Sequence, residues 1–141
     1  MSFDQRDTIG FHAAQLARLV ANRLRDALAP LGVQPAQAAA LIEISQAEGL
    51  TQKELVERLE VEQPGVARTL NGLEADGWIF REGRGGRAQG LYLSDKAAGV
   101  VPEAVKVTAE INRRVLGELS RTEQSHLIGA LEELIGDLKN A

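Results

Sequence analysis

The sequence predicts a mainly α-helical fold that carries one small β-hairpin. Ala and Leu are the most frequent residues, aromatic residues make up 4% of the chain and Pro occupies only 4 positions, which favours helix. Apolar residues recur at three- and four-residue steps over most of the 141 residues, the period of amphipathic helices. Residues 78–93 instead form β-rich runs around a Gly-rich turn. At roughly 100–200 residues per domain, this length corresponds to one domain.

The composition disfavours several classes of protein. The absence of Cys excludes disulfides, thiol redox sensing and thiolate metal sites. With 2 His and no cluster of His and carboxylates, we expect no metal and no other cofactor. No catalytic constellation is visible, so we expect no enzyme activity. No run approaches the roughly 18 apolar residues of a membrane span, and no signal-peptide pattern opens the chain. We therefore expect a soluble, cytoplasmic protein without a membrane partner.

The net charge of −4 at pH 7 argues against a wholly basic nucleic-acid binder, because phosphate contacts supply most non-specific affinity. Of the 16 basic residues, however, 12 are Arg, the side chain suited to bidentate bonds with phosphate and guanine. The distribution of these residues along the chain therefore decides whether nucleic acid is a partner.

The N-terminal half predicts four helices. A long amphipathic helix over 8–29 ends at Pro30, and Pro35 opens a second helix over 35–47. The run 51–54, Thr-Gln-Lys-Glu, has the spacing of a capping box and opens a short third helix. The fourth, over 63–76, has Pro64 early and stops before Gly77. Two short helices that meet across a tight connection, supported by a preceding helix, are typical of a helix-turn-helix unit.

The C-terminal half predicts a hairpin followed by two long helices. The strands are expected at 78–81 and 89–93, with Gly85 and Gly86 supplying the positive φ angles of the turn. Residues 81–93 carry a net charge of +2, so the basic excess lies on a projecting ribbon. Helices are expected over 95–119 and from the capping box at 120–123 to the end, the last with a near-heptad apolar seam.

These elements suggest three parts of one structural domain: an N-terminal dimerisation helix (1–33), a DNA-binding lobe (34–93) and C-terminal dimerisation helices (94–141). The long terminal helices carry apolar stripes that one domain of this size cannot wholly cover. We therefore expect a symmetric homodimer, whose two helix-turn-helix units would match two half-sites about one helical turn apart. The alternative is that the terminal helices fold back on their own chain as a monomeric bundle.

Three runs in the middle of the chain have a characteristic joint spacing. They are Leu50-Thr-Gln-Lys-Glu-Leu-Val-Glu-Arg-Leu59, Glu62-Gln-Pro-Gly-Val-Ala-Arg-Thr-Leu-Asn-Gly-Leu-Glu-Ala-Asp-Gly-Trp-Ile79, and Leu91-Tyr-Leu-Ser-Asp-Lys-Ala-Ala-Gly99 preceded by Arg87. Together they resemble the winged helix-turn-helix regulators of the multiple antibiotic resistance regulator (MarR) family, and the helix order agrees from residue 8 to the end. The resemblance implies a dimer, a recognition helix in the major groove, a wing in the minor groove, and often a small-molecule pocket.

Carried onto this sequence, the resemblance places the recognition helix at 63–76. Gln63, Pro64, Gly65 and Arg68 would face the groove, where Gln can pair with adenine and Arg with guanine. The core side of the same helix would be formed by Val66, Leu70 and Leu73. A salt bridge of Arg68 to Glu62 or Glu74 on a solvated helix face is the alternative for that residue.

The resemblance also implies contacts outside the recognition helix. Thr51 and Gln52 would hold backbone phosphates at a helix N-terminus. Arg84 and Arg87 on the wing would enter or flank the minor groove, whose negative potential attracts Arg. Family wings commonly carry an Asp two residues before the tip Arg, and here that position is Gly85. Which of the two arginines reaches the groove therefore stays open.

Phe11 and His12 are candidates for lining an effector pocket, although core or dimer packing is the favoured interpretation. The leading hypothesis is a dimeric, sequence-specific DNA-binding transcriptional regulator that binds a pseudo-palindromic site in double-stranded DNA. It would act as a repressor, released by a small aromatic or phenolic effector through a population shift. The alternative is a winged-helix interaction module that does not bind DNA.

Overall fold

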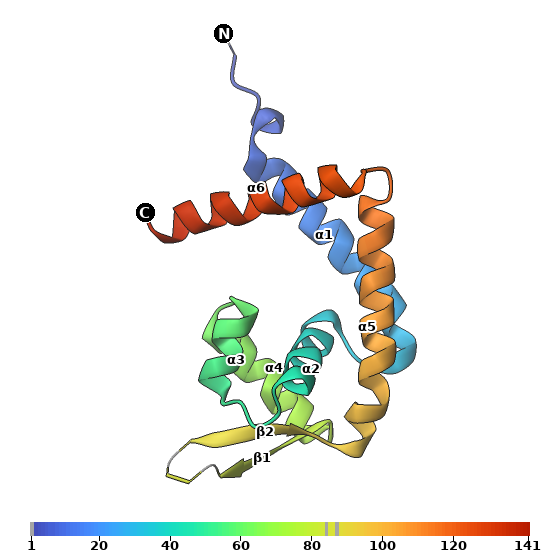
Figure 1. Cartoon of the computed structure of the whole chain (residues 1–141), viewed down its shortest axis with the longest axis vertical. Coiled ribbons are helices and arrows are strands. Elements are labelled where there is room, and N and C mark those ends of the chain that lie inside the picture. Colours follow the sequence, from blue (N-terminus) through green and yellow to red (C-terminus); the bar gives the residue numbers. More distant parts are fainter. Residues whose placement is uncertain (1, 84, 87) are drawn as a thin grey trace. The chain divides into compact units, whose positions relative to one another are not determined.

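The computed structural model describes residues 2–83, 85–86 and 88–141. In this part of the chain, α-helices predominate and a single antiparallel hairpin follows the fourth helix (Figure 1). The predicted mainly α fold with a hairpin is thus confirmed. Contacts group the chain into two compact units, Met1–Thr108 and Ala109–Ala141. The functional division at residues 33 and 93 stays a prediction.

The first unit begins with a 3-10 turn, η1 (Gln5–Asp7), and the long helix α1 (Ile9–Leu28). The Thr8 hydroxyl caps α1 by accepting a hydrogen bond from the Phe11 amide at 3.2 Å. Only the C-terminal end of α1 reaches the core, where Leu28 is buried. A second 3-10 turn, η2 (Ala29–Leu31), then leads into the DNA-binding lobe predicted from the sequence.

Three helices build the core of this lobe: α2 (Pro35–Gln46), α3 (Gln52–Leu59) and α4 (Gln63–Ala75). Their bounds agree with the sequence prediction to within one or two residues, because each helix begins at a capping residue or a Pro that the sequence displays. The helices bury mainly aliphatic side chains against one another: Ala38, Ala40, Leu41, Ile44, Leu55, Val66, Leu70 and Leu73.

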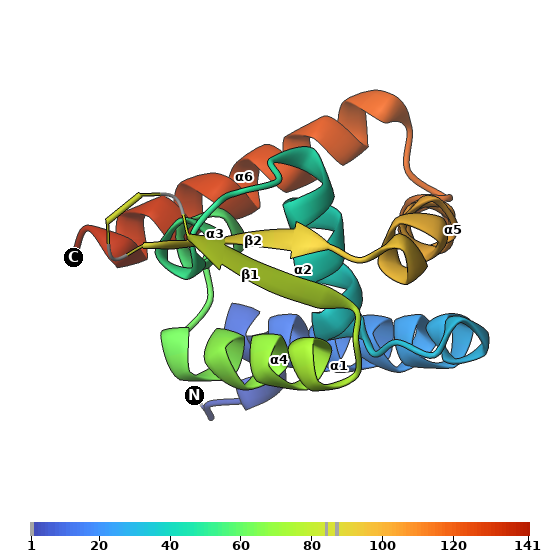
Figure 2. The same ribbon diagram turned by 90° about the horizontal axis from the view of Figure 1, so that it is seen from below.

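The hairpin consists of β1 (Ile79–Gly83) and β2 (Gln89–Leu93), with Ile79 opposite Leu93 and Gly83 opposite Gln89. Figure 2 shows it beside α2, α3 and α4, which its strands contact. The sequence did not reveal a further pairing: the Gly49 amide donates to the Leu91 carbonyl at 2.9 Å, and the Leu91 amide donates to the Leu50 carbonyl at 2.8 Å. The α2–α3 connection thereby ties the hairpin to the helices.

Helix α5 (Asp95–Leu116) follows β2 and contains Pro102. Ser94 joins its start to the hairpin, because the Ser94 hydroxyl donates to the Trp78 carbonyl at 3.0 Å and accepts from the Ala97 amide at 3.3 Å. Trp78 is 6% exposed and belongs to the core. The second unit holds the end of α5 and helix α6 (Arg121–Lys139), which begins at a capping box formed by Ser120 and Glu123.

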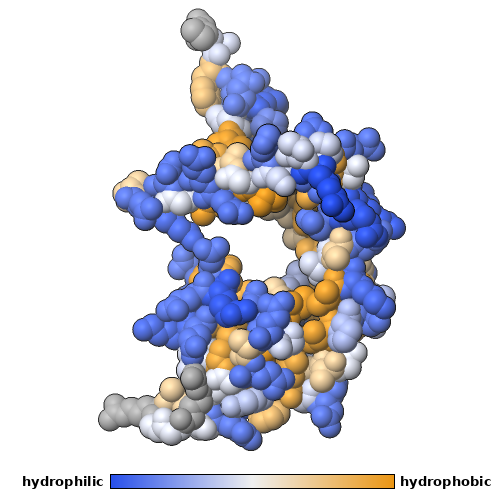
Figure 3. Space-filling view, in the orientation of Figure 1, coloured by the Kyte–Doolittle hydropathy of each residue, from blue (hydrophilic) through white to orange (hydrophobic). Residues whose placement is uncertain are grey.

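Large apolar side chains remain exposed on the terminal helices. On α1 they are Ile9, Leu16 and Leu19, which are 48–65% exposed. On α6 they are Leu127, Ile128, Leu134, Ile135 and Leu138, and apolar surface is visible along that helix in Figure 3. The other exposed positions of these helices hold charged, polar and small residues. Each of the two units thus presents its own apolar stripe.

Candidate nucleic-acid interface

The tight connection between α3 and α4 is built from three residues. Glu60 ends α3 in the left-handed conformation (φ 56°), and its amide donates to the Val56 carbonyl at 3.0 Å. Val61 follows with 54% of its surface exposed, and Glu62 then serves as the N-terminal boundary of α4. The sharp reversal at Glu60 lets two helices of only 8 and 13 residues pack against each other.

Helix α4 has one buried side and one exposed side. Val66, Leu70 and Leu73 are 0–3% exposed and fix the orientation of the helix against the core. Gln63, Pro64 and Arg68 lie on the exposed side, as the sequence predicted for a groove-facing surface. Among the described residues, Arg68 forms no ion pair with Glu62 or Glu74 within 4.0 Å; Glu74 is bound to Arg81 instead.

Gly65 lies between these two sides and is half-buried. No described atom lies within 4 Å of a Cβ built at this position, so packing within the chain does not require glycine here. The Gly65 carbonyl accepts a hydrogen bond from the Thr69 hydroxyl at 3.0 Å. The missing side chain leaves the backbone at the start of α4 open to a close approach from outside.

The N-terminus of α3 is held by a complete capping box. The Glu54 amide donates to the Thr51 hydroxyl at 3.2 Å, and the Thr51 amide donates to the Glu54 carboxylate at 3.1 Å. The Thr51 hydroxyl also donates to that carboxylate, at 3.0 Å. Thr51 is therefore a structural cap in the free protein, and an external phosphate would have to share it. Gln52, the first residue of α3, is half-buried beside it.

Arg81 on β1 connects the hairpin to both helices. Its side chain is 19% exposed, and its guanidinium donates to the Glu74 carboxylate at 3.2 Å, the Gln52 side-chain oxygen at 3.3 Å and the Asn71 side-chain oxygen at 3.5 Å. Arg81 is part of the basic excess that the sequence predicts for the wing. The structure instead directs its charge inward, where Glu74 balances it.

The tip of the hairpin carries the two glycines predicted for its turn. Gly85 has φ 81° and Gly86 has φ 87°, values that a residue with a side chain rarely adopts. A turn at these positions confirms the hairpin geometry read from the sequence. The two predicted minor-groove residues, Arg84 and Arg87, lie outside the described residues.

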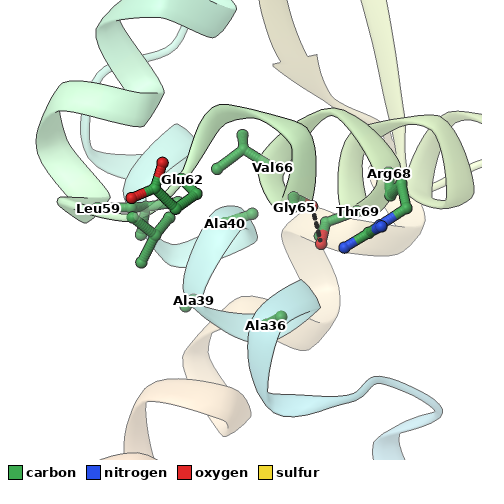
Figure 4. Close-up of a pocket in the computed structure, with 10 residues that line it drawn as sticks. Ala36, Ala39, Ala40, Leu59, Glu62, Gly65, Val66, Arg68 and Thr69 are labelled. Atoms are coloured by element: carbon green, nitrogen blue, oxygen red, sulfur yellow. Dashed lines mark hydrogen bonds between the residues drawn. The ribbon is translucent and has the colours of Figure 1, made fainter.

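A pocket of about 410 Å³ opens beside α4. Figure 4 shows that small side chains of α2 form one wall and that Arg68 stands at the edge next to Thr69. The lining is apolar apart from a few groups: Ala36, Ala39, Ala40, Leu59, Val61, Glu62, Gly65, Val66, Arg68 and Thr69. This pocket adjoins residues that the sequence assigned to DNA contact.

The predicted effector residues Phe11 and His12 do not line that pocket; both lie near the start of α1. Their rings meet edge to face, with centroids 5.6 Å apart. A His12 ring nitrogen lies 2.6 Å from the Arg6 carbonyl and bonds η1 to α1. The favoured interpretation of these residues from the sequence was packing, and their assignment to an effector site stays a prediction.

Comparison with known proteins shows the family of the chain. The sequence profile of the MarR family matches residues 31–88, which include all of α2, α3, α4 and β1. The uncharacterized HTH-type transcriptional regulator YwoH of Bacillus subtilis (strain 168) is 35% identical over 102 residues, covering 72% of this chain and 70% of YwoH. The chain belongs to the MarR family of transcriptional regulators.

Solved structures agree with this assignment at the level of the fold. The transcriptional regulator SlyA superimposes with a TM-score of 0.86 at 22% identity, covering 94% of each chain. MepR of S. aureus, in its complex with DNA, superimposes with a TM-score of 0.85 at 20% identity, covering 93% of this chain and 98% of MepR. The predicted resemblance to winged helix-turn-helix MarR regulators is confirmed.

The side-chain network around Arg81 is the feature of this MarR-family chain that the sequence analysis missed. Its partners Gln52, Asn71 and Glu74 lie 29, 10 and 7 residues away along the chain. No local spacing rule connects positions on a strand and two helices, so only the tertiary packing reveals them.

Over the described residues, no three His or carboxylate groups gather as a metal site would need, and no helix is long and apolar enough to cross a bilayer.

Proposed function

We propose that this MarR-family chain is a homodimeric, sequence-specific DNA-binding repressor that a small molecule releases from its operator. The observation that carries the proposal is the exposed side of α4, which presents Gln63, Pro64 and Arg68 while Val66, Leu70 and Leu73 anchor the helix to the core. Polar side chains such as Gln63 and Arg68 in the N-terminal half of a rigid helix suit base edges in the major groove. The similarity in fold to MepR, which was crystallised with DNA, supports this.

Dimerisation is part of the proposal, because one protomer offers only one recognition helix. The exposed apolar stripes of α1 and α6 support it, because a contiguous exposed stripe such as the one that includes Leu134 and Ile135, each 50% exposed, is typical of a surface that another chain covers. A two-fold dimer would place two α4 helices on a pseudo-palindromic operator. The bound dimer would exclude polymerase from the promoter and so repress transcription.

We propose that the effector binds in the pocket beside α4 and thereby releases the protein from its operator. A small aromatic or phenolic molecule fits the size and apolar lining of the 410 Å³ pocket, and Arg68 at its edge could bind a carboxylate or phenolate. A molecule bound in this pocket would contact Arg68, which the proposal also assigns to DNA contact. Binding of effector and of operator would then oppose each other, with reciprocal effects on affinity.

A gel shift on the promoter region of the chain's own gene tests the proposal. We expect retardation at low salt that weakens as salt rises, and release by an aromatic carboxylate or phenol that also raises the melting temperature of the free protein. Absence of retardation at low salt, with unchanged behaviour of Arg68→Ala and Arg87→Ala, would overturn it. A stable dimer without salt-dependent DNA affinity would instead favour an interaction module, the alternative suggested by the net charge of −4.

A further inference from the structure

We infer that Arg81 is a positioning residue for DNA binding: it turns the side-chain amides of Gln52 and Asn71 so that their NH2 groups face outward as donors to backbone phosphates. The inference rests on the proposed function and extends it. It adds Asn71 to the residues proposed to contact DNA, and it gives the inward-facing Arg81 side chain a positioning role.

The Arg81 side chain forms hydrogen bonds with three residues on two helices. The guanidinium reaches the Gln52 oxygen at 3.3 Å on α3, and the Asn71 oxygen at 3.5 Å and the Glu74 carboxylate at 3.2 Å on α4. With 19% of its side chain exposed, Arg81 has little surface left for a direct contact with DNA. It thus fixes the first residue of α3 and the middle of α4 relative to the hairpin.

The chemistry of these groups determines the orientation of both amides. A guanidinium only donates hydrogen bonds, so each amide must present its oxygen to Arg81. The NH2 group of each amide then points away from Arg81. Without Arg81, the oxygen and NH2 ends could exchange by rotation, and half of the orientations would present an acceptor toward DNA.

Outward donors suit the phosphate backbone, whose oxygens only accept. Gln52 stands at the N-terminus of α3, where unpaired backbone amides add positive potential. Asn71 is exposed on α4, three residues after Arg68 and therefore on the same side of the helix. Because Asn71 lies in the second half of α4 and its oxygen is engaged, we assign it to phosphate rather than to a bidentate contact with adenine.

The test replaces the neutral Arg81–Glu74 pair as a whole. The variant Arg81→Met/Glu74→Gln leaves the net charge unchanged, and the matched control Arg58→Met/Glu43→Gln removes a similar pair, 2.8 Å apart, that joins α3 to α2. Binding to an operator obtained by selection from random double-stranded DNA, and to unrelated DNA, is measured by fluorescence anisotropy over a range of salt concentrations. We expect the Arg81 variant to bind both DNAs about tenfold more weakly, because it loses sequence-independent contacts, whereas the control stays within about twofold of the parent protein.

The salt dependence separates positioning from direct contact. Amide donors are neutral and release no counterions, so the slope of log K against log salt should stay unchanged. If Arg81 itself contacted phosphate, or held the wing in place only, the slope would become shallower by about 0.9 per lost phosphate contact. A shallower slope, or an unchanged affinity, would overturn the inference.

Variants of the two amides keep the inference testable even if Arg81→Met/Glu74→Gln unfolds. Gln52→Met and Asn71→Leu preserve side-chain size but remove the donors, and each should weaken binding to both DNAs without changing the slope. If Arg81→Met/Glu74→Gln folds, a double-mutant cycle adds a second test: in the combined variant Gln52→Met/Asn71→Leu, replacing the Arg81–Glu74 pair should change affinity by less than about twofold. Full additivity would contradict the inference. A parent protein that binds no DNA at low salt would instead refute the proposed function itself.

Discussion

At the scale of single residues, the proposed DNA recognition depends on side chains that the core does not need. Arg68 is exposed, forms no described ion pair with its acidic neighbours on α4, and lies one turn after Pro64. Gly65 meets no described atom where a side chain would begin. Packing within the chain therefore requires neither residue, and each is available for a contact outside the protein. Their prediction as groove-facing residues was possible from the sequence because their position early in a Pro-opened helix is local information.

Replacing Arg68 by Ala should change base preference rather than overall affinity. If Arg68 forms a bidentate contact with guanine, its loss costs about 1–3 kcal/mol at one base pair of each half-site and little elsewhere. Titration of the variant against operators substituted at each position measures this. A uniform loss over all positions would reassign Arg68 to phosphate.

Glu60 offers a test of the helix-turn-helix connection that leaves the exposed side of α4 intact. Its positive φ of 56° is unfavourable for a residue with a Cβ and costless for glycine. Glu60→Gly should therefore raise the free energy of unfolding by about 1 kcal/mol. Urea denaturation followed by circular dichroism measures it, with Glu57→Gly inside α3 as the control, which should be destabilising. A loss of stability in Glu60→Gly would show that contacts of the Glu60 side chain outweigh the backbone strain.

At the scale of elements, the bounds of the helices could be predicted from the sequence, but the hydrogen bonds between the hairpin and the helices could not. Capping residues and Pro35 mark where helices begin, so their bounds were predictable. The bonds of Leu91 to Gly49 and Leu50, and those of Arg81 to both helices, join positions with no periodic relation. They arise only when the hairpin packs against the helices, which is why sequence patterns could not disclose them.

Gly90 tests the connection between the hairpin and the helices. A Cβ at this position would lie 2.8 Å from the Gly49 carbonyl oxygen, closer than side-chain carbons approach backbone. Gly90→Ala should therefore push the strand away from the 49–50 segment and cost about 1–3 kcal/mol. The matched variant Gly83→Ala, where no described atom lies within 4 Å, should cost less. Equal melting temperatures for the two variants would contradict the described pairing.

The capping box of α6 predicts a pH dependence. The Glu123 carboxylate accepts a hydrogen bond from the Ser120 amide, which holds the pKa of Glu123 below its ordinary value. Because the folded pKa is the lower one, the stabilisation is complete above the ordinary pKa and is lost as pH falls through the folded pKa. Acidification in that range should reduce α6 helicity in the parent protein, and less so in Glu123→Gln. An identical pH profile for both proteins would disprove this role.

At the scale of the whole molecule, the exposed stripes on the terminal helices and the one proposed recognition helix per chain lead to the same expectation. A protomer of 15.2 kDa should behave as a dimer of about twice that mass. Leu134→Glu on the α6 stripe should yield monomers that remain helical, because Leu134 is half-exposed in one chain. Light scattering after size exclusion measures the mass, with Glu133→Gln as the control. A dimer that survives Leu134→Glu would place the interface elsewhere.

In the proposed dimer, the net charge of −4 per chain is compatible with DNA binding. The inward direction of Arg81 reduces the basic surface of the wing, so DNA affinity should depend on few charges, each presented twice by a dimer. We therefore expect a modest salt slope and correspondingly strong dependence on base contacts from α4.

The central claim, that a dimer of this chain reads a specific DNA sequence through α4, is tested most directly by selecting bound fragments from a random pool of double-stranded DNA. We predict enrichment of a pseudo-palindrome with half-sites about one helical turn apart, and loss of one conserved base pair per half-site when the selection is repeated with Arg68→Ala. Failure to enrich any sequence at low salt, or enrichment of a motif without two-fold symmetry, would contradict the account.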